Sequence, residues 1–117
     1  MPRLSYVEIP ASATGPSRDF YARAFGWGFT DFGPDYAATT TGDVDLGINA
    51  SGDAPIGAIL PIVEVDDLEA ALAAVVDAGG ELVVPIFAYP GGRRFHFRDP
   101  AGNVLGVFVD ESTSAPA

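Results

Sequence analysis

Hydrophobic and polar side chains alternate most clearly between Arg93 and Arg98, in the stretch RRFHFR. The alternating positions are Phe95 and Phe97 on one face and Arg94, His96 and Arg98 on the other, which is the period of two expected of a β-strand. The segment DPAGN at residues 99–103 predicts a tight turn, because proline presets φ and glycine accepts a positive φ. VLGVFV then continues as an apolar strand. The pattern predicts a β-hairpin whose polar face carries the only histidine of the chain.

The first half of the chain predicts one strand, one helix and three further strands. Residues 4–9 alternate, with Val7 and Ile9 on the side opposite Tyr6 and Glu8. A helix is expected from Pro16 to about residue 25, ended by Gly26, because proline suits the first turn of a helix and glycine its end. Short strands follow at residues 27–32, 36–41 and 43–48. The order is βαβββ.

The same order is predicted again after a linker at residues 50–57, which is rich in small and turn-forming residues. Residues 58–65 read as a strand, and Asp66 is predicted to cap a helix with Glu69 in a capping box. The predicted buried stripe of this helix is Leu68, Leu72, Val75 and Val76. Strands at residues 81–87, 93–98 and 103–109 complete a second module. The expected organisation is therefore one domain with modules at residues 1–49 and 58–110 and a disordered tail at residues 111–117.

Composition narrows the functional classes. With 117 residues, 48% of them hydrophobic, the chain can form an ordinary core, and without cysteine it has neither disulfides nor thiolate chemistry. A net charge of -10 argues against a nucleic-acid partner; it would attract cationic ligands, but the simpler interpretation is that the acidity keeps a small domain soluble and says nothing about ligands. No secretory signal or membrane-spanning segment is recognisable, so a soluble cytoplasmic protein is expected.

Three segments carry a family resemblance. RDFYARAFGWGF at residues 18–29, VEVDDLEAALAAVVDAGG at residues 63–80 and the hairpin at residues 93–110 resemble, in the same order, segments of the vicinal oxygen chelate superfamily. That superfamily includes glyoxalase I, extradiol dioxygenases, and fosfomycin- and bleomycin-resistance proteins. The resemblance implies an α+β fold in which the mixed sheets of two βαβββ modules form a cup with the helices outside, and it implies a homodimer.

The resemblance also gives the positions where the family holds a divalent metal. They are Tyr6, Gly47, Leu60 and Gly106, none of which is a normal ligand for such a metal. Gly47 and Gly106 occupy equivalent places in the two modules. No cofactor is therefore expected. The alternative is a divalent metal (Zn, Ni, Mn or Fe) held by a shifted set of Glu8, Glu64 and His96.

Strand alternation gives the predicted lining of the cup. The candidate ligand-binding residues are Tyr6, Glu8, Asp45, Gly47, Leu60, Ile62, Glu64, Arg94, His96, Gly106 and Phe108. The two glycines are expected to open volume at its floor. A purely structural interpretation has equal weight for the charges, in which Glu8 or Glu64 pairs with Arg94 or Arg98. His96 and Trp27 are expected to be core side chains.

Three functions are compatible with this lining. The favoured one is a metal-free protein similar to the bleomycin-resistance branch, which binds a small aromatic or cationic compound in an acidic cup. The second is a metal-dependent lyase, isomerase or dioxygenase. The third is metal-free acid–base catalysis with His96 transferring the proton, Glu8 orienting it and Tyr6 donating to an oxyanion.

Overall fold

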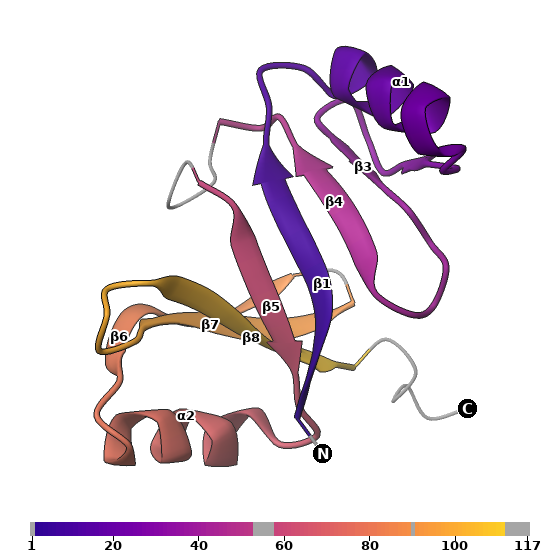
Figure 1. Cartoon of the computed structure of the whole chain (residues 1–117). Helices are drawn as coiled ribbons and strands as arrows, with labels where there is room; N and C mark the ends of the chain where they lie inside the picture. Colours follow the sequence, from indigo (N-terminus) through magenta and orange to yellow (C-terminus); the bar gives the residue numbers. More distant parts are fainter. Residues whose placement is uncertain (1, 53–57, 90, 112–117) are drawn as a thin grey trace, which may run out of the picture. The chain divides into compact units, whose positions relative to one another are not determined.

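The computed structural model describes residues 2–52, 58–89 and 91–111. Its elements, in chain order, are β1 (Arg3–Pro10), α1 (Thr14–Phe25), β2 (Thr30–Asp31), β3 (Tyr36–Ala38), β4 (Asp45–Asn49), β5 (Leu60–Glu64), α2 (Leu68–Asp77), β6 (Glu81–Tyr89), β7 (Gly92–Arg98) and β8 (Val104–Asp110) (Figure 1). The sequence βαβββ occurs twice, so the predicted α+β fold of two such modules is confirmed.

The chain forms two compact units, Ser5–Leu60 and Met1–Leu4 with Pro61–Ala117, which we describe separately as the first and second unit. The predicted linker and tail fall largely on residues 53–57 and 112–117, outside the described residues. The module boundaries therefore stay a prediction. No helix in the described ranges is long and apolar enough to span a membrane.

In the first unit the strand order is β2-β3-β4-β1, with β1 parallel to β4 and the other pairs antiparallel. Helix α1 packs against β3 and β4 and ends where Gly26 adopts φ 73°, as predicted for a glycine stop. Ala37 and Ile48, which are partners in the β3–β4 register, are completely buried. No residue of α1 itself is buried. The helix therefore covers only part of its side of the sheet.

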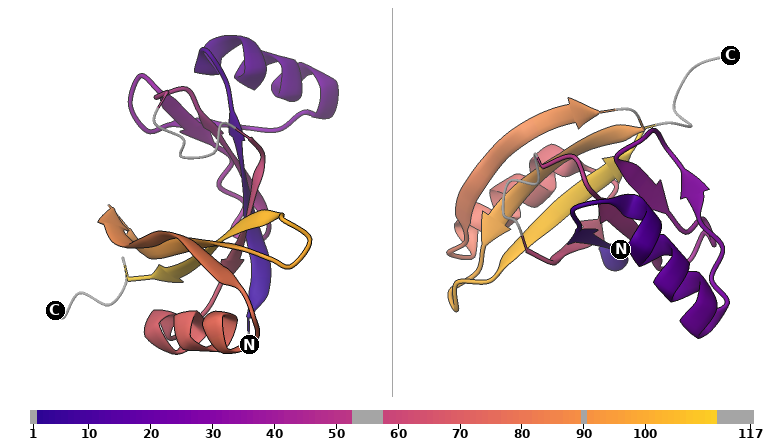
Figure 2. Two further views of the ribbon diagram at one scale, coloured as in Figure 1. Left: turned by 90° about the vertical axis from the view of Figure 1, so that its left-hand side faces the viewer. Right: turned by 90° about the horizontal axis from the view of Figure 1, so that it is seen from above.

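In the second unit the strand order is β5-β8-β7-β6, with β5 parallel to β8 and the other pairs antiparallel. Helix α2 lies along one face of β6, β7 and β8 (Figure 2). The buried residues between helix and sheet are Val65, Leu68, Phe95, Val107 and Val109. Phe95 points into this core as its alternation predicted. Its strand neighbours Arg94 and His96 consequently face away from α2.

Two details of α2 differ from the prediction. The helix is capped by Asp67 rather than Asp66, since the Asp67 carboxylate accepts a hydrogen bond from the backbone N–H of Ala70 three residues later. Glu69 pairs with Arg93 at 2.5 Å instead of closing a capping box. Val76, expected in the buried stripe, is 54% exposed, because the packed face runs through Leu68, Ala71, Leu72 and Val75.

Candidate functional site

A hydrogen-bonded group of side chains lies on one face of the first unit, and we call it the tyrosine–glutamate cluster. Tyr6 and Glu8 come from β1, Tyr36 from the start of β3, and Asn49 from the end of β4. The hydroxyls of Tyr6 and Tyr36 lie 2.7 Å apart, and the Tyr36 hydroxyl donates to Glu8 Oε2 at 2.9 Å. Asn49 Nδ2 donates to Glu8 Oε1 at 3.4 Å. These contacts allow Glu8, which is only 6% exposed, to be buried with its carboxylate hydrogen-bonded.

Gly47 makes this meeting of hydroxyls possible. It is the register partner of Glu8 on β1 and of Ala38 on β3. A Cβ atom at position 47 would collide with the hydroxyl oxygens of both Tyr6 and Tyr36. The space above this glycine is therefore filled by the two hydroxyls, where the sequence predicted open volume.

The donor in each hydrogen bond of the tyrosine–glutamate cluster can be assigned. Tyr36 has a single hydroxyl proton and donates it to Glu8, so in the bond between the tyrosines Tyr6 is the donor. Burial and then the neighbouring charge of Glu8 raise the pKa of Tyr36 well above its usual value, which keeps this phenol protonated. The Tyr6 proton is engaged by Tyr36 in this arrangement. Its predicted role as donor to an oxyanion stays a prediction.

In the second unit, the face of the sheet away from α2 carries rows of predicted site residues. Opposite positions on neighbouring strands share a face. One row joins Ile62, Gly106 and His96, and the next joins Glu64, Phe108 and Arg94. Strand alternation therefore grouped these six residues correctly, while their function stays a prediction.

Aromatic side chains surround the basic residues of this face. The Arg94 guanidinium lies 5.3 Å from the ring centroids of both Phe87 and Tyr89, a cation–π distance. Tyr89 also packs against Phe108 at 6.0 Å. His96 is completely buried and meets Phe87 edge-on at 5.8 Å. An aromatic surface with one guanidinium is suited to contact a planar ligand.

Other predicted residues have different partners. The Asp45 carboxylate accepts hydrogen bonds from the Thr39 hydroxyl, the Thr41 hydroxyl and backbone, and the Gly42 backbone. Arg98 pairs with Glu81 at 2.9 Å, not with Glu8 or Glu64. Leu60 is 3% exposed at the boundary of the first unit.

Sequence reasoning missed Tyr36, Phe87 and Tyr89. Tyr36 follows the turn at residues 33–35, and its role depends on the β3–β4 register, which brings its hydroxyl over Gly47. Phe87 and Tyr89 lie beyond shifts in the β6–β7 register, so simple alternation along β6 does not place them beside Arg94. The signal available was their aromatic character near a predicted hairpin. Trp27 was expected in the core, but it is 42% exposed.

The repeated βαβββ order defines a class of small α+β proteins. Comparisons with known proteins identify the family within that class. The model of the Glyoxalase/Bleomycin resistance protein/Dioxygenase superfamily matches residues 3–107. The chain belongs to this superfamily, as its sequence motifs predicted.

Relatives and solved structures agree with this assignment. The CFP32 protein of Mycobacterium bovis, which is named as a glyoxylase, is 30% identical over 89% of this chain and 44% of its own length. The chain thus spans less than half of this relative. A superfamily member from Vibrio splendidus has a similar fold (TM-score 0.71, 18% identity, 94% of this chain and all of that one). So has the Mn(II)-bound glyoxalase from Novosphingobium aromaticivorans (TM-score 0.66, 20% identity, 94% of this chain and 40% of that one).

The residues at the positions implied for a metal do not fit one. Tyr6 donates its proton to Tyr36, and Gly47 and Gly106 have no side chain that could bind a metal. Within residues 2–52, 58–89 and 91–111, no group of three His, Asp or Glu side chains could hold a metal ion. Glu8 lies in the first unit and Glu64 and His96 in the second. This shifted set therefore stays a prediction.

Proposed function

We propose that this chain is a metal-independent binding protein that takes up a small organic ligand at the tyrosine–glutamate cluster. The observation that supports the proposal is the pair of hydroxyls above Gly47, at a place where the family resemblance implies metal ligands. Phenol oxygens backed by a buried carboxylate recognise the polar groups of an organic molecule, whereas a hard or borderline metal prefers carboxylate and imidazole ligands. A net charge of -10 favours a ligand with a cationic or hydrogen-donating group.

The second unit has an aromatic surface of its own, which we propose as a separate place for a planar ligand. Phe87, Tyr89 and Phe108 present rings next to Arg94, and such rings bind planar molecules by stacking and edge contacts. The competing proposal is a metal-dependent enzyme, which the glyoxylase name of the mycobacterial relative favours. Acid–base catalysis by His96 with Glu8 is a third possibility. Measurements of the metal content of the purified protein and of its ligand binding distinguish these three functions.

The proposal predicts that ligand binding needs Tyr36 and not a metal. We expect protein purified without chelator to contain far less than stoichiometric Zn, Ni, Mn or Fe, and a ligand-induced shift of the melting temperature that survives chelation. The ligands to screen are cationic glycopeptides, planar aromatic compounds and small dicarbonyl metabolites. In Tyr36→Phe the buried Glu8 loses the hydrogen bond from the Tyr36 hydroxyl and keeps the one from Asn49, which should cost about 1–3 kcal/mol of stability and abolish the shift given by the best ligand.

Tyr21→Phe is the matched control, because it removes a phenol hydroxyl from α1, outside the cluster. It should retain the ligand-induced shift. Stoichiometric metal that is lost in a His96→Ala variant would instead establish the metal-dependent enzyme. A Tyr36→Phe variant that binds as tightly as the native chain would refute a role for the cluster.

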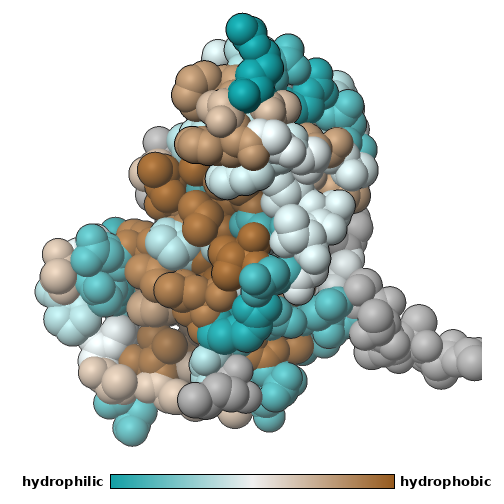
Figure 3. Space-filling view, turned by 45° about the vertical axis from the view of Figure 1, so that its right-hand side comes forward, coloured by the Kyte–Doolittle hydropathy of each residue, from teal (hydrophilic) through white to brown (hydrophobic). Residues whose placement is uncertain are grey.

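We also propose that the chain forms a homodimer through apolar side chains of α1. Phe20 and Phe25 are 60% and 61% exposed, and Figure 3 shows that hydrophobic residues are present at the surface that it draws. Sedimentation at micromolar concentration should give a dimer mass. Replacing both phenylalanines with serine should give a monomer, whereas Leu82→Ser, at an exposed leucine of β6, should not. A native chain that sediments only as a monomer would contradict the proposal.

A further inference from the structure

The hydrogen bonds that join the four side chains of the tyrosine–glutamate cluster all run toward Glu8. Tyr6 donates to Tyr36 and Tyr36 donates to Glu8 Oε2, so the single proton of each phenol is used inside the cluster. Asn49 Nδ2 donates to the other carboxylate oxygen, Oε1. The Asn49 amide is oriented independently, because its Oδ1 accepts the backbone N–H and the hydroxyl of Ser51 at 2.9 and 2.6 Å. The buried carboxylate therefore sets the direction in which the phenol protons point.

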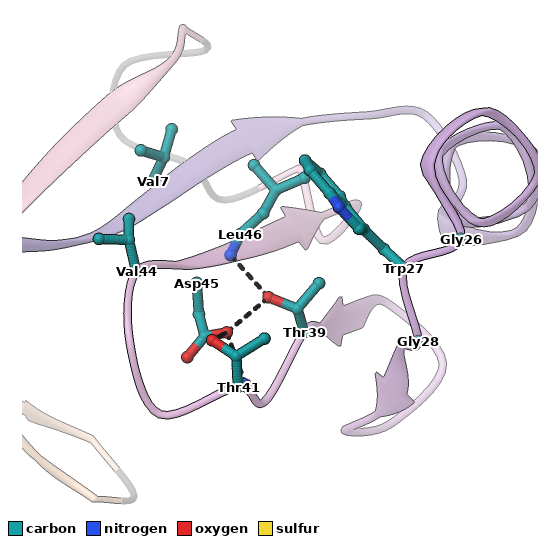
Figure 4. Close-up of a pocket in the computed structure, with 9 residues that line it drawn as sticks. All are labelled: Val7, Gly26, Trp27, Gly28, Thr39, Thr41, Val44, Asp45 and Leu46. Atoms are coloured by element: carbon teal, nitrogen blue, oxygen red, sulfur yellow. Dashed lines mark hydrogen bonds between the residues drawn. The ribbon is translucent and has the colours of Figure 1, made fainter.

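A second carboxylate, that of Asp45, belongs to a different network although Asp45 is the register partner of Tyr6. Its Oδ1 accepts the Thr39 hydroxyl at 2.7 Å and the Thr41 hydroxyl and backbone N–H at 2.8 Å. Figure 4 shows these bonds at a pocket of the first unit that is lined in part by Trp27. The carboxylate that orients the phenol protons is therefore Glu8 and not Asp45.

The atoms that the cluster presents to a ligand are phenol oxygens. Tyr6 and Tyr36 are half-buried and Glu8 is 6% exposed, so an approaching molecule meets the phenols before the carboxylate. A hydroxyl oxygen has two lone pairs in addition to its proton. Since both protons are directed toward Glu8, the phenols offer lone pairs and no proton. Asn49 keeps a second amide N–H, but it lies at the opposite oxygen of Glu8.

We propose that the tyrosine–glutamate cluster selects planar organic ligands that donate a hydrogen bond, with an N–H of the ligand accepted by the Tyr6 oxygen. The hydrogen bonds that link Tyr6 through Tyr36 to the charge of Glu8 polarise one another, which strengthens the phenol oxygens as acceptors. A carbonyl or an oxyanion would meet lone pairs, and a phenol would have to turn away from its partner to receive it. The inference rests on the proposed function, because it takes the cluster as the ligand site, and it adds the chemical class of the ligand.

Two probes of nearly the same shape distinguish a donor from an acceptor. Indole has one N–H, and benzofuran has a ring oxygen in its place. We expect the native chain to bind indole about tenfold more tightly than benzofuran, a difference typical of one hydrogen bond. The affinities are measured by titrating protein labelled with carbon-13 at the tyrosine Cζ, which gives signals for four tyrosines. Tyr6 and Tyr36 should shift saturably, whereas Tyr21 on α1 should not shift.

Glu8→Gln is the sharpest variant, because it should reverse the direction of the hydrogen bonds. If Oε1 still accepts from Asn49, the new Nε2 takes the place of Oε2 and can only donate to Tyr36. The Tyr36 proton then turns to Tyr6, and the Tyr6 proton becomes available to a ligand. Benzofuran should therefore bind more tightly than indole in this variant. A side chain with a merely structural role would not invert the preference.

Tyr6→Phe is a second variant that leaves the bond between Tyr36 and Glu8 in place. It removes the accepting oxygen, so indole should lose its advantage over benzofuran. Tyr89→Phe is the matched control, because it removes a phenol hydroxyl from the second unit, and it should keep the tenfold preference of about the native size.

The outcomes separate this inference from the proposed function. Equal affinity of the native chain for the two probes, or a preference for indole that survives Glu8→Gln, would overturn the inference and leave the cluster as a ligand site. If neither probe shifts the Tyr6 signal, the inference fails as well. The ligand-induced melting shift in Tyr36→Phe then decides the proposed function independently.

Discussion

Replacing Gly47 with alanine should lower the free energy of unfolding by about 1–3 kcal/mol, the cost typical of a group forced into filled space. The new methyl group would collide with the hydroxyl oxygens of Tyr6 and Tyr36. If the tyrosines move aside, Tyr36 loses its hydrogen bond to Glu8, whose carboxylate is almost completely buried. Both responses are costly. Chemical denaturation followed by circular dichroism measures the loss.

Gly28→Ala is the matched control for this experiment. A Cβ atom at position 28 would meet no other atom within 4 Å, so the stability should change by less than about 0.5 kcal/mol. In a Tyr6→Phe, Tyr36→Phe background both hydroxyl oxygens are gone, and Gly47→Ala should cost less than in the native chain. Equal costs for Gly47→Ala and Gly28→Ala in the native chain would refute the close contact of the two hydroxyls.

Local sequence patterns were sufficient to predict the two modules, because helices, strands and turns depend mainly on residues that are neighbours in the sequence. The turn at residues 99–103 forms as expected, with the Asp99 carboxylate accepting the backbone N–H groups of Ala101 and Asn103 and Gly102 at φ 92°. The error at the start of α2 is of another kind. Asp66 and Asp67 are adjacent and chemically identical, so the sequence does not show which of them caps the helix. The helix begins at Leu68, and the residue before it, Asp67, accepts the backbone N–H of Ala70.

Only those features of the candidate site that follow from the alternation of side chains along strands were predicted from the sequence. This alternation gave two groups of residues on one face of the second unit. It grouped Ile62, Gly106 and His96, and separately Glu64, Phe108 and Arg94, because these positions follow a period of two along paired strands. Alternation contains no information about which distant side chain fills the space above a glycine. Tyr36 was therefore missed, although its hydroxyl connects Tyr6 to Glu8.

Trp27 shows a second limit of sequence reasoning. Large aromatic residues are usually packed, so a core position was the natural expectation. In the structure α1 contacts β3 and β4, and Trp27 remains at the edge of a pocket that the helix does not cover. How far a helix covers its sheet depends on the loops at both ends and not on the periodicity of the helix.

Replacing Phe95 with alanine should have the largest effect on stability, a loss of about 3–5 kcal/mol. Its ring is completely buried among Leu68, Val107 and Val109, so the substitution leaves a cavity beneath α2. For a domain whose total stability is about 5–15 kcal/mol, the melting temperature should fall sharply. Phe32→Ala removes the same ring from a position that is 57% exposed, and it should cost less than about 1 kcal/mol.

The same variant tests how the core positions the polar face of the second unit. Phe95 lies between Arg94 and His96 on β7, and their side chains point to the other face of the sheet. If the core fixes this strand, Phe95→Ala should change the spectrum of the single histidine at temperatures where the chain is still folded, whereas Phe32→Ala should not. A proton–carbon correlation spectrum of the His96 ring provides that measurement. An unchanged His96 signal in a folded but destabilised Phe95→Ala chain would mean that the strand keeps its position without the ring, and that pairing with β6 and β8 is sufficient to orient the face.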